Sequence, residues 1–177
     1  MDNVAYDIRR ATLDDAEALA QVHETTWRET YSGLMSEQLL TALTTDARAE
    51  GWRRILSGQA GYLATTYVAE RGGTLAAYGS CGEQRNPDFA RAGYRGEFAA
   101  VYVLAKDQRR GLGTRLMTTM MGDLTARGLT SFTLWVPRNN IPARSLYEQL
   151  GGTVIGQKTD AREQGILVEI AYGWPAP

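Results

Sequence analysis

One segment near the middle of the chain, residues 102–115, limits the possible folds most strongly. An apolar run ends at Leu104, a short basic loop follows, and a glycine-rich turn then opens a helical pattern. Apolar residues recur there at four-residue steps, so we expect a helix from Gly111 to Arg127 that Gly128 terminates. The next apolar run, residues 130–136, predicts a strand. A strand–helix–strand unit of this kind pairs its two strands in parallel.

The rest of the chain adds hairpins and further helices to this unit. We expect strands at 7–9, 62–70, 74–82, 95–104, 154–157 and 166–172, a loop at 86–93, and helices at about 16–29, from Ser36 onward and at 142–150. This mixed order indicates an α+β fold built on a mixed sheet. The chain has 177 residues and neither a linker nor an internal repeat, so we expect a single domain over residues 1–177.

The basic loop and the glycine-rich turn favour an anion. The ionisable side chains of residues 102–115 carry a net of three positive charges, from Lys106, Arg109, Arg110 and Arg115 against Asp107. The first turn of the expected helix has no Asp or Glu, so its free backbone amides and its dipole are unopposed. Gly111 and Gly113 let the backbone approach phosphate oxygens without a Cβ in the way.

Two widespread phosphate-binding motifs do not fit this turn. A dinucleotide fingerprint needs a third glycine where this chain has Leu116, and a P-loop needs Gly-Lys followed by Ser or Thr, which does not occur. Taken alone, the turn leaves two interpretations open: a phosphate site and a solvated helix start.

A second segment adds a family resemblance. Residues 108–113, Gln-Arg-Arg-Gly-Leu-Gly, resemble motif A of the GNAT superfamily of N-acetyltransferases, [Gln/Arg]-x-x-Gly-x-[Gly/Ala]. Residues 140–151 resemble its motif B, Asn-x-x-Ala-x-x-x-Tyr-x-x-x-Gly, and the expected strand order matches that family over nearly the whole chain. The resemblance implies the GNAT fold, a central mixed sheet flanked by helices. One departure is Gly151-Gly152, where the family often has Gly-Phe.

The resemblance also implies the cofactor, acetyl-CoA, and where it binds. Its pyrophosphate is expected on the backbone amides from Arg109 to Thr114, and its pantetheine arm is expected to pair like a strand with residues 101–103, where the family's central strand splays from its neighbour. Asn140 matches the motif B asparagine that approaches the pantetheine. The implied cofactor-binding residues are Val101, Tyr102, Val103, Gln108, Arg109, Arg110, Gly111, Leu112, Gly113, Thr114 and Asn140.

Tyr147 matches the family's tyrosine near the thioester sulfur, which implies that it protonates the leaving thiolate. A phenol of pKa ~10 is suited to a thiol near 8.5. The residues alone also permit another interpretation, because Ala143, Leu146, Tyr147 and Leu150 form one apolar helical face and a tyrosine there is usually core.

Glu97 is the first candidate for the base that deprotonates the amine, because strand alternation places it on one face with Val101 and Val103. A carboxylate on such a face needs a partner. The competing interpretation of Glu97 is a salt bridge at the end of the strand. A bulge before Val101 would also reverse the alternation and move Glu97 to the other face. Glu83 is the second candidate for the base.

His23, Trp27 and Tyr31 recur at four-residue steps along the first helix. In the resembled family this helix often walls the acceptor pocket, so Trp27 and Tyr31 are expected to bind substrate. Core packing is the competing interpretation, and it is the favoured one for His23.

These features together predict an enzyme that moves the acetyl group of acetyl-CoA to a primary amine by direct attack through a tetrahedral intermediate. The acceptor is a small molecule or an amine of a peptide or protein. The alternative is a non-catalytic module of the same fold that binds acyl-CoA as a sensor or structural ligand. A net charge of −1 argues against a nucleic-acid partner.

Composition and the chain's first residues set the remaining expectations. One histidine and one cysteine are too few for a usual zinc site, so no metal is expected. The first residues lack the pattern of a secretory signal, and no apolar run is long enough to span a membrane. We therefore expect a cytoplasmic protein without a membrane partner; the resemblance leaves a homodimer possible.

Overall fold

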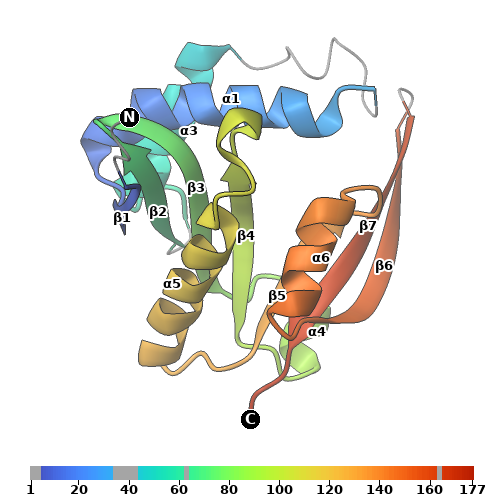
Figure 1. Cartoon of the computed structure of the whole chain (residues 1–177). Coiled ribbons are helices and arrows are strands. Elements are labelled where there is room, and N and C mark those ends of the chain that lie inside the picture. The colour runs from blue at the N-terminus through green and yellow to red at the C-terminus, as the bar shows by residue number, and fades with distance from the viewer. Residues whose placement is uncertain (1–4, 34–43, 62–63, 163–164) are drawn as a thin grey trace.

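The computed structural model describes residues 5–33, 44–61, 64–162 and 165–177, and it contains one seven-stranded sheet of order β1-β2-β3-β4-β5-β7-β6 (Figure 1). The strands are β1 (Asp7–Arg10), β2 (Ala64–Arg71), β3 (Thr74–Glu83), β4 (Gly96–Val103), β5 (Phe132–Pro137), β6 (Thr153–Arg162) and β7 (Gly165–Trp174). The helices are α1 (Ala16–Tyr31), α3 (Thr45–Leu56), α4 (Pro87–Arg91), α5 (Leu112–Ala126) and α6 (Ile141–Gln149), with short 3-10 turns at Leu13–Asp15 and Ala105–Asp107. The predicted mixed sheet with flanking helices is confirmed.

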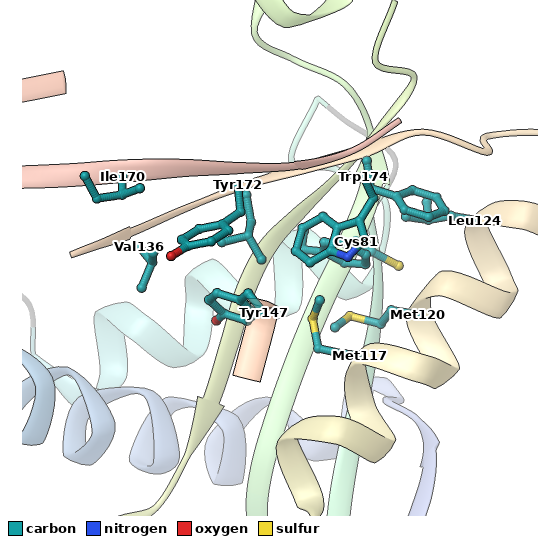
Figure 2. Close-up of a cluster of buried hydrophobic side chains, with 12 residues drawn as sticks. Cys81, Met117, Met120, Leu124, Val136, Tyr147, Ile170, Tyr172 and Trp174 are labelled. Atoms are coloured by element: carbon teal, nitrogen blue, oxygen red, sulfur yellow. The ribbon is translucent and has the colours of Figure 1, made fainter. Parts of the chain in front are cut away.

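Helices cover both faces of the sheet. Buried side chains of α1 and α3 pack on β2, β3 and β4, around Leu19, Trp52 and Tyr78. On the opposite face α5 and α6 pack on β4, β5 and β7 (Figure 1). Figure 2 shows this second core, in which Tyr147 lies among Met117, Val136, Tyr172 and Trp174. Burial of two such apolar layers is the main source of stability in a domain of this kind.

The sheet opens in its middle. β4 and β5 are its parallel pair, and among the described residues their pairing is confined to Gly96 with Phe132 and Glu97 with Thr133. Every other neighbouring pair is antiparallel. The second half of β4 is therefore paired with β3 on one side only, and its other edge faces a gap. The splayed central strand that the resemblance implies is thus present.

A β-bulge lies in β4 just before this gap. Ser80 of β3 pairs with Ala100, but the next residue, Cys81, pairs with Phe98, so Ala99 is an extra residue in β4. An extra residue reverses the alternation of side chains along a strand. Phe98 and Val101 accordingly pack in the same core, beside α5 and α6.

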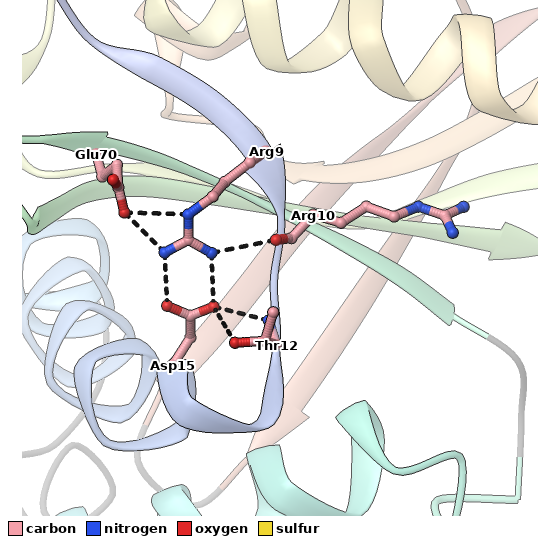
Figure 3. A network of polar contacts seen from close by, with 5 residues as sticks. All are labelled: Arg9, Arg10, Thr12, Asp15 and Glu70. Atoms are coloured by element: carbon pink, nitrogen blue, oxygen red, sulfur yellow. Dashed lines mark hydrogen bonds and ion pairs between the residues drawn. The ribbon is translucent and has the colours of Figure 1, made fainter.

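A polar cluster fastens the start of α1 to the sheet (Figure 3). The Asp15 carboxylate accepts two hydrogen bonds from the Arg9 guanidinium, at 2.8 and 2.9 Å, and one from the Thr12 backbone amide at 2.7 Å. Arg9 also donates to Glu70 of β2. Thr12 caps the 3-10 turn Leu13–Asp15 that leads into α1, and the reciprocal contact of a capping box between Thr12 and Asp15 is present.

Some predicted elements differ from the structure. Residues 86–93, predicted as a loop, contain α4, because the Asn86 side chain caps it by accepting from the amides of Asp88 and Phe89. β6 extends to Arg162, well beyond the predicted end at residue 157. The helix predicted from Ser36, with Leu39, Leu40 and Leu43 on one face, lies outside the described residues. Within the described ranges, we find no helix whose length and hydropathy would let it span a bilayer.

Candidate active site

A cleft of about 400 Å³ lies where β4 separates from β5. Its walls come from the exposed end of β4, the glycine-rich turn, α6 and Thr30 of α1. All of the predicted cofactor-binding residues except Arg110 line it, and so does Tyr147. The sequence analysis did not predict Thr30, Pro142, Ala143, Ser145, Leu146 and Gln149 as lining residues. Helical spacing from Asn140 and Tyr147 would have indicated the residues of α6.

The turn at the start of α5 is held in an unusual backbone conformation. Gly111 is the N-terminal cap of the helix and has φ of 77°, a left-handed conformation that glycine adopts without strain. Arg109 has φ of 62°, which is uncommon for a residue with a side chain and often marks a functional loop. No acidic residue lies in the first turn of α5. The free backbone amides of this turn are therefore not opposed by a negative charge, and this end of the cleft is suited to bind an anion.

Gly113 also has a packing role that was not predicted. A Cβ at this position would lie 2.8 Å from Cδ2 of Leu146, which belongs to α6. Gly113 therefore allows α5 and α6 to approach each other, whereas Gly111 supplies the turn. Both contributions shape the same cleft.

The loop before the turn is anchored through its own residue Asp107, whose side chain is buried, at 3% exposed. The Tyr6 hydroxyl donates to its carboxylate at 2.5 Å, and the Arg71 guanidinium lies 3.6 Å away, over the Tyr6 ring. The hydrogen bond to Asp107 is the largest cause that raises the pKa of Tyr6. Arg115, beyond the turn, donates to the Tyr6 carbonyl oxygen at 3.0 Å. Tyr6 thus holds both sides of the turn, and the sequence analysis gave it no role.

Two polar side chains at the cleft are already engaged in the fold. Gln108 donates from Nε2 to the carbonyl oxygen of Val103 at 3.1 Å, which connects the loop to the end of β4. Asn140 caps α6, because its Oδ1 accepts from the Ala143 amide at 3.3 Å. Its position in the sequence motif is therefore explained in part by helix capping.

Tyr147 belongs to the core and to the cleft at once. Its side chain is 5% exposed and its ring packs edge-on against Trp174, yet it also lines the cleft. Burial, and then the nearby Tyr102, raises the pKa of its phenol above the usual range. Among the described residues, no group is hydrogen-bonded to its hydroxyl. A protonated phenol in a residue that lines this cleft is suited to donate a proton.

Comparison with known proteins bears on this arrangement. The family described as "Acetyltransferase (GNAT) family" matches residues 19–152, more than half of the chain. The chain belongs to the GNAT family of acetyltransferases. A curated relative, the uncharacterized N-acetyltransferase YuaI of Bacillus subtilis, is 28% identical over 95% of this chain and 92% of its own.

Solved structures share the fold of this acetyltransferase. The yncA protein of Salmonella typhimurium, a putative acetyltransferase determined with its cofactor acetyl-CoA, has a TM-score of 0.73 and 22% identity over 98% of this chain and 95% of its own. The PaiA N-acetyltransferase of Thermoplasma acidophilum, determined with coenzyme A, has a TM-score of 0.69 and 19% identity over 93% of this chain and 98% of its own.

The expectation that Glu97 shares a strand face with Val101 and Val103 is wrong, because the bulge at Ala99 intervenes. Glu97 lines a separate pocket of about 360 Å³ together with Glu83, the second candidate. Its carboxylate is paired with the Arg85 guanidinium and also accepts from the Arg85 backbone amide at 3.1 Å. The competing interpretation, a salt bridge at the strand end, describes Glu97 correctly, and neither glutamate lines the cleft.

The aromatic stripe of α1 lies beside the cleft rather than in its lining. Trp27 and Tyr31 pack together with ring centroids 4.3 Å apart, and His23 stacks on Tyr102 of β4 at 6.4 Å. Burial, and then Arg48, lowers the pKa of His23 to about 4. His23 is therefore neutral at pH 7 within an aromatic cluster, as its core interpretation predicts. Tyr31 is close to Tyr102, Glu169 and Tyr147, whose proximity adds to burial in raising the pKa of its phenol.

The departure from the family pattern at Gly152 has a packing reason. A Cβ there would lie 2.6 Å from the Trp174 ring and 3.0 Å from the Tyr147 carbonyl oxygen. Trp174 therefore fills the space beside α6, and glycine is required where the family often has phenylalanine.

Proposed function

We propose that this protein transfers the acetyl group of acetyl-CoA to a primary amine by direct attack. The observation that carries the proposal is the cleft between β4 and β5, which has a phosphate-suited turn at one end and the Tyr147 phenol in its wall. Family membership and the two relatives determined with coenzyme A or acetyl-CoA support the choice of donor.

The residues of the cleft fit that donor. Gly111 and the strained Arg109 hold backbone amides at the start of α5, where a pyrophosphate is suited to bind. The free edge of β4 at Val101, Tyr102 and Val103 offers backbone groups to an extended pantetheine arm. When bound, acetyl-CoA supplies an activated acyl group and a thiol leaving group.

The chain's own groups then meet three chemical demands. A primary amine of pKa ~10.4 is mostly protonated at pH 7, so its deprotonation costs about 4.6 kcal/mol and needs an acceptor for the proton, direct or through water. The C–N bond forms first, and the backbone amide of Val103 in β4 holds the negative charge that develops on the carbonyl oxygen of the tetrahedral intermediate. When this intermediate collapses and the C–S bond breaks, Tyr147 donates its proton to the leaving thiolate.

A thiol-release assay tests this proposal. Purified protein is mixed with acetyl-CoA and a panel of primary amines, and free thiol and acetylated amine are both quantified. We expect amine-dependent release of coenzyme A matched by acetylated product. Tight binding of acetyl-CoA with no turnover of any amine would instead favour the non-catalytic acyl-CoA-binding module.

A further inference from the structure

A primary ammonium group already occupies a defined position on the sheet face toward α1. Lys158 of β6 and Glu169 of β7 are directly paired across the two strands, with Nζ of Lys158 3.0 Å from Oε2 of Glu169. The same ammonium lies 4.4 Å from the ring centre of Trp135 on β5. A carboxylate and an aromatic face together form a binding arrangement for an alkylammonium ion.

Strand alternation places this arrangement on the sheet face toward α1, opposite the core that contains Tyr147. Ile170 and Tyr172 of β7 face the core that contains Tyr147, so Glu169 faces the opposite side of the sheet. Glu169 of β7 pairs with Pro137, the last residue of β5, so one strand separates it from the gap between β4 and β5. Tyr102 projects to this side from β4, as its stacking on His23 of α1 indicates.

The Glu169 carboxylate is also close enough to the phenols of Tyr31 and Tyr102 to interact with them electrostatically. Burial is the main cause that raises the pKa values of Tyr31 and Tyr102, and the Glu169 carboxylate contributes to both. Figure 1 shows the β6–β7 hairpin rising past α6 toward the level of the C-terminal end of α1. The Glu169 carboxylate and the phenols of Tyr31 and Tyr102 thus lie near one another on the α1 side of the sheet.

The two members of the ion pair differ in how firmly they are held. The Glu169 side chain is 16% exposed, whereas the Lys158 side chain is 48% exposed. An exposed lysine on a flexible stem contributes little to stability through such a pair. Another ammonium of the same chemistry can therefore take its place, while the mostly buried carboxylate stays.

We propose that Glu169 holds the ammonium group of the amine acceptor, in the position that Lys158 Nζ occupies in this structure. This inference rests on the proposed transferase function and narrows its substrate class to cationic amines on an apolar or aromatic body, with Trp135 and Tyr102 as the neighbouring surfaces. Lys158 is then an internal competitor that swings to solvent when the acceptor binds.

Two substitutions that break the same ion pair from opposite sides test this role. Glu169→Gln removes the carboxylate, and Lys158→Met removes the competing ammonium but keeps an apolar stem. Binding of 2-phenylethylamine to the protein loaded with coenzyme A is measured by calorimetry, with the uncharged 2-phenylethanol as control ligand. KM values for 2-phenylethylamine, tyramine and hexylamine are measured in parallel with the Kd for acetyl-CoA.

We expect Glu169→Gln to raise both Kd and KM for the amines at least tenfold, as loss of a charge-assisted contact does. Lys158→Met is expected to lower them, and both variants are expected to keep the Kd for acetyl-CoA within about twofold. A purely structural ion pair predicts that the two variants behave alike, and that outcome would overturn the inference.

Two further outcomes distinguish failure of the proposed Glu169 role from failure of the proposed transferase function. If the unmodified protein binds acetyl-CoA but none of these amines, the role of Glu169 is refuted while the transferase proposal stands for other acceptors. If it does not bind acetyl-CoA, the transferase proposal fails first, and the inference fails with it.

Discussion

At the scale of single residues, Tyr147 shows how one side chain serves both packing and chemistry. Its ring packs in the core between α6 and β7 (Figure 2), and the residue also lines the cleft. Tyr147→Phe keeps the ring and removes only the acidic hydrogen. We expect kcat to fall about a hundredfold, as for loss of a general acid, while the Kd for acetyl-CoA and the midpoint of unfolding change little. Steady-state kinetics with unchanged kcat would remove Tyr147 from the mechanism.

Asp15 is the residue that most clearly ties stability to pH. The Arg9 guanidinium is the main cause that lowers the pKa of Asp15 to about 2, from an ordinary value of 3.8. A lowered folded-state pKa stabilises the fold above about pH 4, and the benefit is lost as pH falls towards 2. We expect Asp15→Asn to reduce the free energy of unfolding at pH 7 by about 2 kcal/mol.

Urea unfolding across pH checks this prediction. The difference in unfolding free energy between the variant and the unmodified protein should shrink between pH 4 and pH 2. A difference that stays constant over that range would show that Asp15 acts through packing rather than through its charge.

At the scale of elements, the N-terminus of α5 depends on one backbone conformation. Gly111→Ala places a Cβ in open space but at φ of 77°, so we expect a loss of about 1–2 kcal/mol from backbone strain and weaker acetyl-CoA binding. Gly122→Ala lies within the same helix, at ordinary φ and with no atom near the added Cβ, and is expected to stabilise by about 0.5–1 kcal/mol. Denaturant unfolding measures the stability of this matched pair of variants and calorimetry measures their binding of acetyl-CoA. The comparison separates the effect of backbone strain at Gly111 from the effect of adding a methyl group. Equal effects on the two would contradict the account.

Local patterns predicted most elements because each is governed by neighbouring residues. Apolar residues at four-residue steps predicted α5, and the strands predicted at 62–70 and 74–82 are the β2–β3 hairpin, whose ends pair as Arg71 with Thr74. α4 was missed because its one short turn depends on the Asn86 cap rather than on periodicity. Most of β6 was missed because its later half is polar.

Predicted residues from motifs that are local in the sequence come together in the structure, whereas a residue whose placement depends on strand register does not join them. The glycine-rich turn, the end of β4, Asn140 and Tyr147 do meet in one cleft. Glu97 was assigned to the wrong face because a single extra residue, Ala99, cannot be read from alternation alone. Tyr6 and Glu169 were not predicted because each reaches its neighbours through pairings with distant parts of the chain.

At the scale of the whole molecule, the sheet is built to open at one place. Within the part of the chain that the structure describes, β4 pairs with β3 along its length but with β5 only at Gly96 and Glu97, and separate cores support the two halves. A ligand that fills the gap and pairs with β4 therefore joins the two halves of the sheet. Binding of such a ligand stabilises the folded state in proportion to its saturation.

The central claim is that this cleft binds acetyl-CoA, and the unfolding midpoint with and without this ligand tests it most directly. At about 100 times Kd the expected stabilisation is about 2.7 kcal/mol, or about 5–10 °C for a domain of this size. NAD and ATP, which carry similar phosphates without a pantetheine arm, should give little shift. A rise specific to acetyl-CoA is the predicted result. No rise at millimolar acetyl-CoA would contradict the assignment of the cleft and the roles given to Tyr147 and Glu169.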